Sequence, residues 1–394
     1  MVLDTFKNLP KLNKDIITLT SELVRIPSIN SNDINKDIPN IHIMANFIKD
    51  WLVTREIDAQ IKIFDNYPVV IAEIGKGKKT IMLNGHMDVV PIGDKTKWSI
   101  DPFLGRIIGD RIYGRGTTDM KSGLSIFMKL LVDMNKKLDY KIIFTAVSDE
   151  ETGGHHCSKK IAEYYNPDLV LISEPTCNNI AIGEKGIFTI KLMAEGKSAH
   201  SSLPSTGKNA ILLMMKDLKS LSRIQKLVVK NPEQIKDILR DSNKLYSYDA
   251  NKITFNPAII SGGTKANMVP DCCNTIIDMR LPPGISTERV LKITESYIAN
   301  SKIIAERCVE PSYTDPNNPY LVKFLDVSRL SGNLDTNFFI FTGGTDAKYF
   351  RYKNIPTIIY GPGDLKLAHS YDEYVTFDQL KIAFDTYNEF LSKI

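Results

Sequence analysis

Apolar residues recur with helical spacing in two stretches near the start of the chain. These stretches cover residues 12–24 and 41–53, and short β-rich runs follow them. An apolar stripe that repeats every 3.6 residues is typical of an amphipathic helix. Helices that alternate with strands indicate a layered α/β sheet. We therefore expect the N-terminal third of the chain to form an α/β domain.

Continuous apolar runs further along the chain predict strands that are buried on both faces. Strands of a parallel sheet have this pattern because helices cover both faces of the sheet. Each run ends in polar residues or in a glycine-rich turn, which marks the end of the strand. The runs cover residues 80–83, 141–147, 169–172 and 357–360.

The pattern changes in the middle of the chain, between about Gly183 and Pro311. Alternating apolar and polar positions predict strands at 188–193, 253–260 and 274–279, and helical spacing predicts helices at 209–222 and 287–300. Ser286 and Thr287 are cap candidates for the second helix. This pattern indicates a separate α+β unit, residues 184–311, inserted between two parts of a first domain, residues 1–183 and 312–394.

The composition is that of a globular protein. Of 394 residues, 43% are apolar and 24% are charged, and this length exceeds what a single core usually supports. The 50 basic and 46 acidic residues leave a net charge of +4. Short lysine clusters such as residues 76–79 lack the interleaved aromatic residues of a nucleic-acid platform. We expect no nucleic-acid partner.

No apolar run approaches the roughly 20 residues that span a bilayer. The opening segment, MVLDTFKNLPKLNKD, has no apolar region followed by a small-residue cleavage site. We expect no membrane partner and a cytoplasmic location. The five cysteines are odd in number and form no C-x-x-C pair, which argues against a disulfide framework and a thiolate zinc site. Any metal must therefore be bound by histidine and carboxylate groups.

Acidic residues and histidines follow the predicted buried strands. Ligands of an open α/β sheet bind outside the carboxyl ends of its strands. Asp119 lies at the start of an apolar-periodic helix, where the helix dipole favours negative charge. The residues that follow the four strands are His86, Asp88, Glu150, Glu151, Glu174 and His369.

Two histidines with several carboxylates suit Zn²⁺, with Co²⁺ or Mn²⁺ as alternatives. One carboxylate can bridge two ions about 3.5–4 Å apart, a spacing that stabilises both nucleophile and oxyanion in hydrolysis. Successive residues of extended backbone point in opposite directions, so one of Glu150 and Glu151 can bind metal while the other acts as a base. A single acid after a strand is usually a cap or turn residue. Six such groups at four strand ends, together with Asp119 at a helix start, favour a metal site over a set of unrelated cap or turn residues.

Three other segments do not match the functional motifs that they partly resemble. Gly114-Arg115-Gly116 begins like a dinucleotide fingerprint, but Asp119 occupies the third glycine position. Residues 75–80 are too few for a P-loop, and residues 196–200, GKSAH, do not match the G-x-S-x-G motif of serine hydrolases.

Eight segments of the chain are highly specific when taken together. They are NGHMDVVP (84–91), WSIDPF (98–103), YGRGTTDMKSG (113–123), DEETGG (149–154), SEP (173–175), GKSAHSSLPSTGKNA (196–210), FTGGTDA (341–347) and GPGDLKLAHSYDEYV (361–375). These segments resemble the M20 family of metallopeptidases and deacylases, and the resemblance covers nearly the whole chain. It is closest to the branch of succinyl-diaminopimelate desuccinylase and acetylornithine deacetylase. It implies an α/β catalytic domain with a mixed sheet and an inserted α+β lid domain.

The resemblance implies two divalent metal ions, most simply Zn²⁺. His86 and Glu174 would bind the first ion, and Glu151 and His369 would bind the second. Asp119 would bridge the two ions.

The resemblance also implies catalytic roles. Glu150 would be the general base, which takes a proton from the metal-bridged water and passes it to the leaving amine. Asp88 would orient the imidazole of His86. His200 would stabilise the oxyanion from the partner subunit, which implies a homodimer formed through the lid domains. The peptide bond between Asp119 and Met120 would be cis.

Substrate contacts are implied for Arg280, Asn267, Gly344 and Thr345. A guanidinium group suits a substrate carboxylate, although Arg280 could also be an ordinary strand residue and Asn267 a turn residue. The expected activity is that of a dizinc N-acyl amino-acid amidohydrolase, which removes a succinyl or acetyl group in amino-acid biosynthesis. The alternative is a metallo-dipeptidase or carboxypeptidase. A third reading, an inactive binding protein, requires a missing ligand or base, and none is missing.

Overall fold

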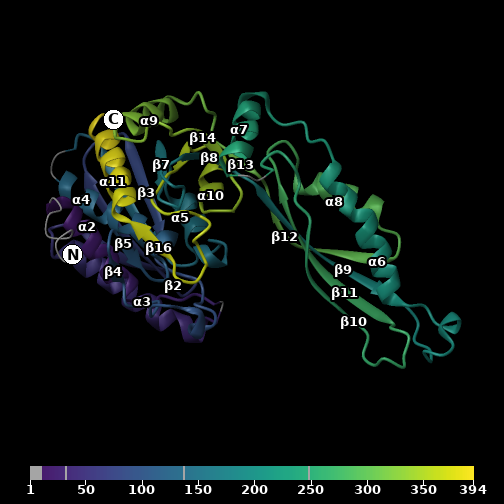
Figure 1. Cartoon of the computed structure of the whole chain (residues 1–394). Coiled ribbons are helices and arrows are strands. Elements are labelled where there is room, and N and C mark those ends of the chain that lie inside the picture. The colour runs from purple at the N-terminus through teal and green to yellow at the C-terminus, as the bar shows by residue number, and fades with distance from the viewer. Residues whose placement is uncertain (1–10, 32, 136–137, 247–248) are drawn as a thin grey trace. The chain divides into compact units, whose positions relative to one another are not determined.

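The computed structural model describes residues 11–394 except residue 32 and the segments 136–137 and 247–248 (Figure 1). The chain divides into two compact units. The first unit comprises Met1–Ile182, Thr314–Phe338 and Thr345–Ile394. The second unit comprises Gly183–Tyr313 and Phe339–Gly344.

The second unit thus includes residues 339–344, which the sequence analysis assigned to the catalytic domain. Two hydrogen bonds within this unit explain the difference. The backbone N–H of Lys185 donates to the carbonyl of Phe341 (2.9 Å), and the backbone N–H of Ile340 donates to Ser242 Oγ (3.1 Å). Such long-range pairings are invisible to local periodicity.

The central sheet of the first unit runs in the order β1-β2-β6-β3-β7-β15. Its middle is parallel: β3 pairs in parallel with β6 and β7, and β7 pairs in parallel with β15. Its edge is antiparallel, formed by β1 and β2. The bounds are β1 (Ala59–Phe64), β2 (Tyr67–Gly75), β3 (Thr80–His86), β6 (Lys141–Val147), β7 (Leu169–Ile172) and β15 (Thr357–Ile359).

The four predicted buried strands are therefore the four adjacent parallel strands of this mixed sheet, and the predicted fold class is confirmed. One of them, β3, continues past its apolar run to His86. Asn84 can stay buried there because its side-chain oxygen accepts a hydrogen bond from Thr145 Oγ1 (2.7 Å) on the neighbouring strand. The extension carries a polar residue to the carboxyl end of the strand.

Helices and a small antiparallel sheet complete the first unit. Among the helices, α4 contacts both α2 and α11. None of the described helices combines the length and the apolar character that a bilayer span requires. The helices are α2 (Lys11–Val24), α3 (Ile34–Val53), α4 (Ser122–Met134), α5 (Ser158–Tyr164), α9 (Pro319–Leu330), α10 (Ala347–Arg351) and α11 (Phe377–Ser392), and the small sheet is β16 (Tyr374–Thr376), β5 (Arg111–Tyr113) and β4 (Arg106–Ile108).

Helix α3 begins seven residues earlier than the periodicity predicted, at Ile34 instead of residue 41. The carboxylate of Asp37 accepts hydrogen bonds from the backbone N–H groups of Ser31 (2.6 Å) and Asp33 (3.2 Å). This contact anchors the start of the helix upstream of its apolar stripe. It depends on polar residues, so hydrophobic spacing does not reveal it.

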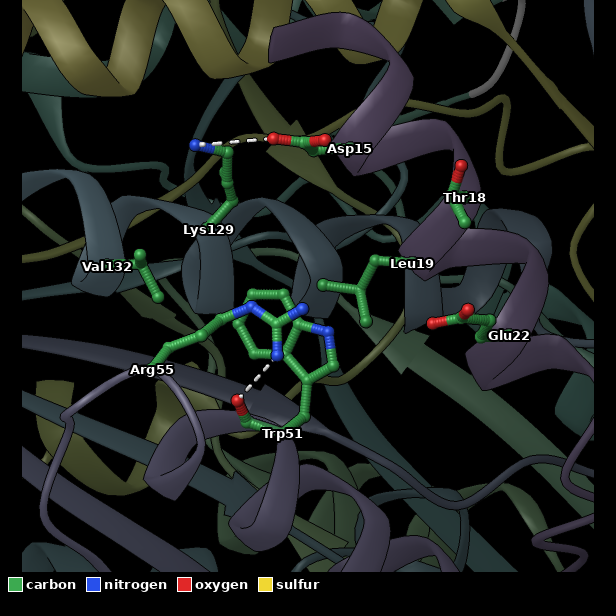
Figure 2. Close-up of a pocket in the computed structure, with 8 residues that line it drawn as sticks. All are labelled: Asp15, Thr18, Leu19, Glu22, Trp51, Arg55, Lys129 and Val132. Atoms are coloured by element: carbon green, nitrogen blue, oxygen red, sulfur yellow. Dashed lines mark hydrogen bonds and ion pairs between the residues drawn. The ribbon is translucent and has the colours of Figure 1, made fainter. Parts of the chain in front are cut away.

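A pocket of about 230 Å³ lies between α2, α3 and α4 (Figure 2). The guanidinium group of Arg55 lies 3.8 Å above the centre of the Trp51 ring. The ammonium group of Lys129 lies 3.9 Å from the carboxylate of Asp15 and also pairs with Asp133. The cations that line this pocket thus have partners within the protein.

The second unit is an antiparallel sheet covered by helices, in the strand order β10-β11-β9-β12. Ser286 caps α8, as predicted, because its side chain accepts a hydrogen bond from the backbone N–H of Arg289 (3.2 Å). The bounds are β9 (Gly186–Glu195), β10 (Asn256–Gly262), β11 (Cys272–Leu281), β12 (Ser301–Val309), α6 (Ala210–Leu221), α7 (Lys236–Tyr246) and α8 (Thr287–Tyr297). Three short strands lie near the junctions of the units: β8 (Ile180–Glu184), β13 (Ser312–Tyr313) and β14 (Phe338–Phe341).

An aromatic cluster holds α9 and α11 against β15 in the first unit. The ring of Phe324 is fully buried, and its centre lies 4.8 Å from that of Phe390, 5.1 Å from Tyr360 and 5.7 Å from Tyr387. We expect Phe324→Ala to lower the free energy of unfolding of the first unit by about 3–5 kcal/mol, because it removes buried area and leaves a cavity.

A urea titration checks this expectation, with Val322→Ala as the control. Val322 lies on the same helix but is 45% exposed. The control should change the free energy of unfolding by less than about 0.5 kcal/mol. Equal effects of the two variants would contradict the assignment of Phe324 to the core.

Candidate metal centre

The parallel strands bring the predicted metal-type residues to one edge of the sheet. His86 is the last residue of β3, and Glu174 lies two residues beyond β7. The short helix η3 (Glu150–Thr152) follows β6, and His369 lies in the loop after β15. Carboxyl ends of adjacent parallel strands share an edge, which is why residues so far apart in the chain meet here.

Asp119 reaches the same edge from the turn Thr117–Lys121, directly before α4, and its own backbone in this turn is not helical. The peptide bond between Asp119 and Met120 is cis, as the resemblance implied. The two carboxylate oxygens of Asp119 face different histidines. Oδ1 lies 2.9 Å from His86 Nε2, and Oδ2 lies 3.3 Å from His369 Nε2. Asp119 therefore lies between the two imidazoles.

A further carboxylate lies beside each histidine. Glu174 Oε1 is 3.7 Å from His86 Nε2, and Glu151 Oε2 is 3.2 Å from His369 Nε2. Two groups of side chains could each hold a metal ion, with ligand atoms within 4.8 Å of one another. The groups are His86, Asp119 and Glu151, and His86, Glu150 and Glu174.

These residues fit a divalent cation. Glu151 Oε1 is buried and has no hydrogen-bond partner among the residues that the structure describes. A buried carboxylate oxygen without a partner is costly unless a cation or a donor meets it. Carboxylate and imidazole donors without a thiolate suit Zn²⁺, Co²⁺ or Mn²⁺.

The crowding of charge shifts the pKa of several groups. Burial and then the charge of Asp119 raise the pKa of Glu174 to about 8. Hydrogen bonds to Asp119 and Glu151 raise the pKa of His369 to about 10. Burial raises the pKa of Glu150, and the charges of Glu174 and Asp346 raise it further. The carboxyl groups of Glu174 and Glu150 therefore retain their protons more readily than isolated carboxyl groups do. A bound divalent cation would favour the charged forms of both groups.

Asp88 holds His86 differently from the expectation. The backbone carbonyl of Asp88 lies 2.9 Å from His86 Nδ1, whereas its carboxylate oxygen Oδ1 lies 3.5 Å away. The other oxygen, Oδ2, accepts hydrogen bonds from Asn30 Nδ2 and the backbone N–H of Glu151, both at 3.2 Å. The carboxylate therefore links β3 to the segment that carries Glu151. Asn30 was not predicted, because no motif contains it.

The exposure of the two histidines differs. The side chain of His86 is 1% exposed, whereas that of His369 is 52% exposed. His369 also has a left-handed backbone, with φ of 60°, in a loop. One imidazole is thus fixed by a strand and the other is presented by a loop.

Glu373 supports the turn that carries Asp119. Its buried carboxylate accepts hydrogen bonds from the backbone N–H groups of Gly116 (3.0 Å), Thr118 (2.8 Å) and Asp119 (3.2 Å). It also pairs with Arg115 Nη1 at 2.6 Å. Sequence analysis missed this role, although Glu373 lies within the GPGDLKLAHSYDEYV segment. Glu373 fixes the backbone of the turn from one side.

The remaining predicted site residues lie mainly in the second unit. His200 is exposed, and its Nδ1 lies 2.8 Å from Ser202 Oγ. The structure brings it near Asn267, because the carbonyl of Asn267 accepts a hydrogen bond from the backbone N–H of Ser201 (3.1 Å). Arg280 Nε donates to Asp278 Oδ1 (2.9 Å) on the same strand. Gly344 is the last residue of the second unit, and Thr345 begins the final segment of the first unit.

We expect Glu373→Gln to weaken Zn²⁺ binding by about 10- to 100-fold, because residues that support metal ligands typically contribute this much. The amide NH₂ would face a backbone N–H, and Arg115 would lose its buried partner. Competition titration with a zinc chelator measures the affinity. Glu389→Gln is the control, since Glu389 pairs with Lys393 on the surface and its side chain is 45% exposed. An unchanged affinity in Glu373→Gln would show that this support is dispensable.

Comparison with known proteins assigns the chain to a family. The model of "Peptidase family M20/M25/M40" matches residues 82–393. A probable succinyl-diaminopimelate desuccinylase from Staphylococcus aureus (strain MRSA252) is 28% identical over 95% of this chain and 96% of its own length. An acetylornithine deacetylase from Pectobacterium carotovorum (strain PC1) is 30% identical over 91% of this chain and 92% of its own length.

A similar fold occurs among solved structures. An M20 family metallo-carboxypeptidase from Sulfolobus solfataricus superposes on this chain with a TM-score of 0.78. The superposition covers 97% of this chain and 99% of the carboxypeptidase, and the two sequences are 20% identical. The family match spans most of the chain, and the relatives match it nearly end to end. The chain therefore belongs to peptidase family M20/M25/M40 and is a hydrolase of that family.

Proposed function

We propose that the chain is a two-metal amidohydrolase that removes a succinyl or acetyl group from a small amino-acid substrate. The observation that carries this proposal is the position of Asp119, whose two carboxylate oxygens face His86 and His369. Glu174 stands beside the first histidine and Glu151 beside the second. This arrangement supports one ion on each side of a bridging carboxylate.

Zn²⁺, or Co²⁺ or Mn²⁺ in its place, would polarise the substrate carbonyl and make water acidic enough to act as a nucleophile near neutral pH. Glu150 is the proposed base. It takes a proton from the attacking water as the new C–O bond forms, and returns the proton to the nitrogen as the C–N bond breaks. The products are a carboxylic acid and an amine.

Glu150 suits this task because its carboxylate lies within the group formed with His86 and Glu174. A base must lie within reach of the proton that it removes. Burial in this cluster raises the pKa of Glu150 above its ordinary value. The same group of side chains could also hold a metal ion, and the variants below separate the two roles.

Relatives named for desuccinylation and deacetylation support this substrate class. The second candidate function is peptide hydrolysis by a metallo-carboxypeptidase or dipeptidase, which the carboxypeptidase with the similar fold favours. In either case Arg280 and Asn267, with Gly344 and Thr345, are the proposed substrate contacts. A hydrolysis screen of N-succinyl-diaminopimelate, N-acetylornithine, N-acetyl amino acids and dipeptides, each with Zn²⁺ or Co²⁺, separates the two functions. Hydrolysis of none of these substrates would contradict both.

We expect Glu150→Gln to lower kcat by about 10²- to 10⁴-fold while two metal ions per chain are retained, because a base acts chiefly in the transition state. Glu151→Gln should instead reduce the metal content. Elemental analysis of metal-reconstituted protein and steady-state kinetics provide the two measurements. Glu163→Gln is the control, since Glu163 is exposed on α5. Loss of metal from Glu150→Gln would contradict the role of Glu150 as a base. Full metal content in Glu151→Gln would contradict the role of Glu151 as a metal ligand.

We further propose that the second unit acts as a lid and forms a homodimer. Exposed apolar side chains support an interface: Leu212 and Met215 on α6 are 54% and 57% exposed, and Ile259 and Ile260 on β10 are 58% and 56% exposed. The strand β10 is also an edge of its sheet, with backbone groups available for pairing. Apolar side chains exposed on these two elements support an interaction surface on the second unit.

If His200 completes the site of the partner subunit, then mixing Glu150→Ala with His200→Ala should restore activity. Each parent is expected to be inactive, and a mixed dimer rebuilds one complete site. Turnover and native mass spectrometry measure activity and dimer formation together. Heterodimers that form without any return of activity would show that His200 does not act in the neighbouring site.

A further inference from the structure

The start of α10 packs against the loop that carries the proposed base. Asp346 precedes α10 and is 1% exposed. Its Oδ2 accepts a hydrogen bond from Ser158 Oγ at 2.5 Å, where the loop enters α5. Three residues later, Tyr349 Oη donates to the carbonyl of Gly153 (2.7 Å). The two contacts hold both ends of the segment that follows Glu150 and Glu151.

A third contact is a close approach of Asp346 to the backbone of Gly154. Gly154 has a left-handed backbone, with φ of 71°, and a Cβ atom at this position would lie 2.1 Å from Asp346 Oδ1. Only glycine therefore fits without moving the carboxylate. The loop and the carboxylate are packed to fit each other.

The carboxylate of Asp346 is only partly paired within the described part of the protein. Its Oδ1 is buried and has no hydrogen-bond partner among the described residues. The ammonium group of Lys348 donates to the carbonyl of Thr345 (2.8 Å) and supplies positive charge nearby. A carboxylate that is buried and only partly satisfied costs stability.

The contacts of α10 reach the proposed base through one backbone turn. The backbone N–H of Gly153 donates to the carbonyl of Glu150 (2.7 Å), and the backbone N–H of Gly154 donates to the carbonyl of Asp149 (2.8 Å). Gly153 is the residue that Tyr349 holds, and Gly154 is the residue that packs against Asp346. The position of Glu150 therefore depends on the glycines that the start of α10 contacts.

We propose that Asp346 is a positioning residue for Glu150, which fixes the loop of residues 149–158 through its hydrogen bond to Ser158 and its packing against Gly154. This inference rests on the proposed function, in which Glu150 is the base. Asp346 acts through the loop and touches neither substrate nor metal. Because the loop also carries Glu151, small displacements of it would misplace the base relative to the attacking water.

The test uses Asp346→Asn, which keeps the size of the side chain but removes its charge. The expected result is a kcat about 10- to 100-fold lower, as for a misplacement of about 1 Å, with KM within about twofold and metal content unchanged. The substrate is whichever compound of the hydrolysis screen is cleaved fastest. Asp217→Asn is the matched control. Asp217 is a buried acid of α6 whose carboxylate accepts hydrogen bonds from Ala299, Asn300 and Ser301, and its loss should leave kcat unchanged.

Amide hydrogen exchange of the metal-free protein gives a readout that does not depend on turnover. In Asp346→Asn, and in Ser158→Ala, the peptide that spans residues 149–158 should exchange about tenfold faster than in the wild type. Ser158→Ala removes the hydrogen bond but keeps the charge, and it serves if Asp346→Asn fails to fold. Asp217→Asn should leave this peptide unchanged.

The outcomes separate the inference from the proposed function. If Glu150→Gln abolishes turnover but Asp346→Asn changes neither kcat nor exchange, the inference alone is wrong. A loss of metal from Asp346→Asn would make it a support of the metal ligands instead, which also overturns the inference. If Glu150→Gln retains full turnover, the proposed function fails first.

Discussion

Repulsion among buried carboxylates is the constraint on which the rest of this structure depends. Asp119, Glu151 and Glu174 meet at one sheet edge, with Glu150 beside them. Like charges at such distances cannot all ionise in a buried site unless cations compensate them. The two histidines compensate only in part, and burial together with the charge of Asp119 raises the pKa of Glu174. The site is arranged for a higher positive charge than the protein itself provides.

Holding such a cluster together requires contacts from outside it. Glu373 fixes three backbone N–H groups of the turn that presents Asp119, and Arg115 pairs with Glu373 from behind. The carboxylate of Asp88 links the His86 strand to the backbone of Glu151. Asp119 and Glu151 are therefore oriented by groups outside the cluster. These hydrogen bonds offset part of the cost of the repulsion.

Much of this organisation could be predicted from the sequence, because it follows from local patterns. Apolar runs without alternation identified β3, β6, β7 and β15 as buried parallel strands, and strand ends then located His86, Glu150, Glu151 and Glu174. The positions that prediction missed depend on distant partners. Glu373 acts 254 positions away from Asp119, and Asp346 bonds Ser158 across 188 positions. The orientation of His86 was also not predictable, since the backbone and the side chain of Asp88 compete for the same ring nitrogen.

If two ions bind as proposed, the unequal histidines imply that the two positions do not load alike. His86 is the last residue of a central strand, so its imidazole cannot move away from an ion without movement of the strand. His369 projects from a loop and is half exposed, so a rotation of one loop would release an ion on its side. Occupancy would then be stepwise, with a retained ion and an exchangeable one. An enzyme built this way would sense the free metal concentration around it, because its fully loaded fraction follows the weaker position alone.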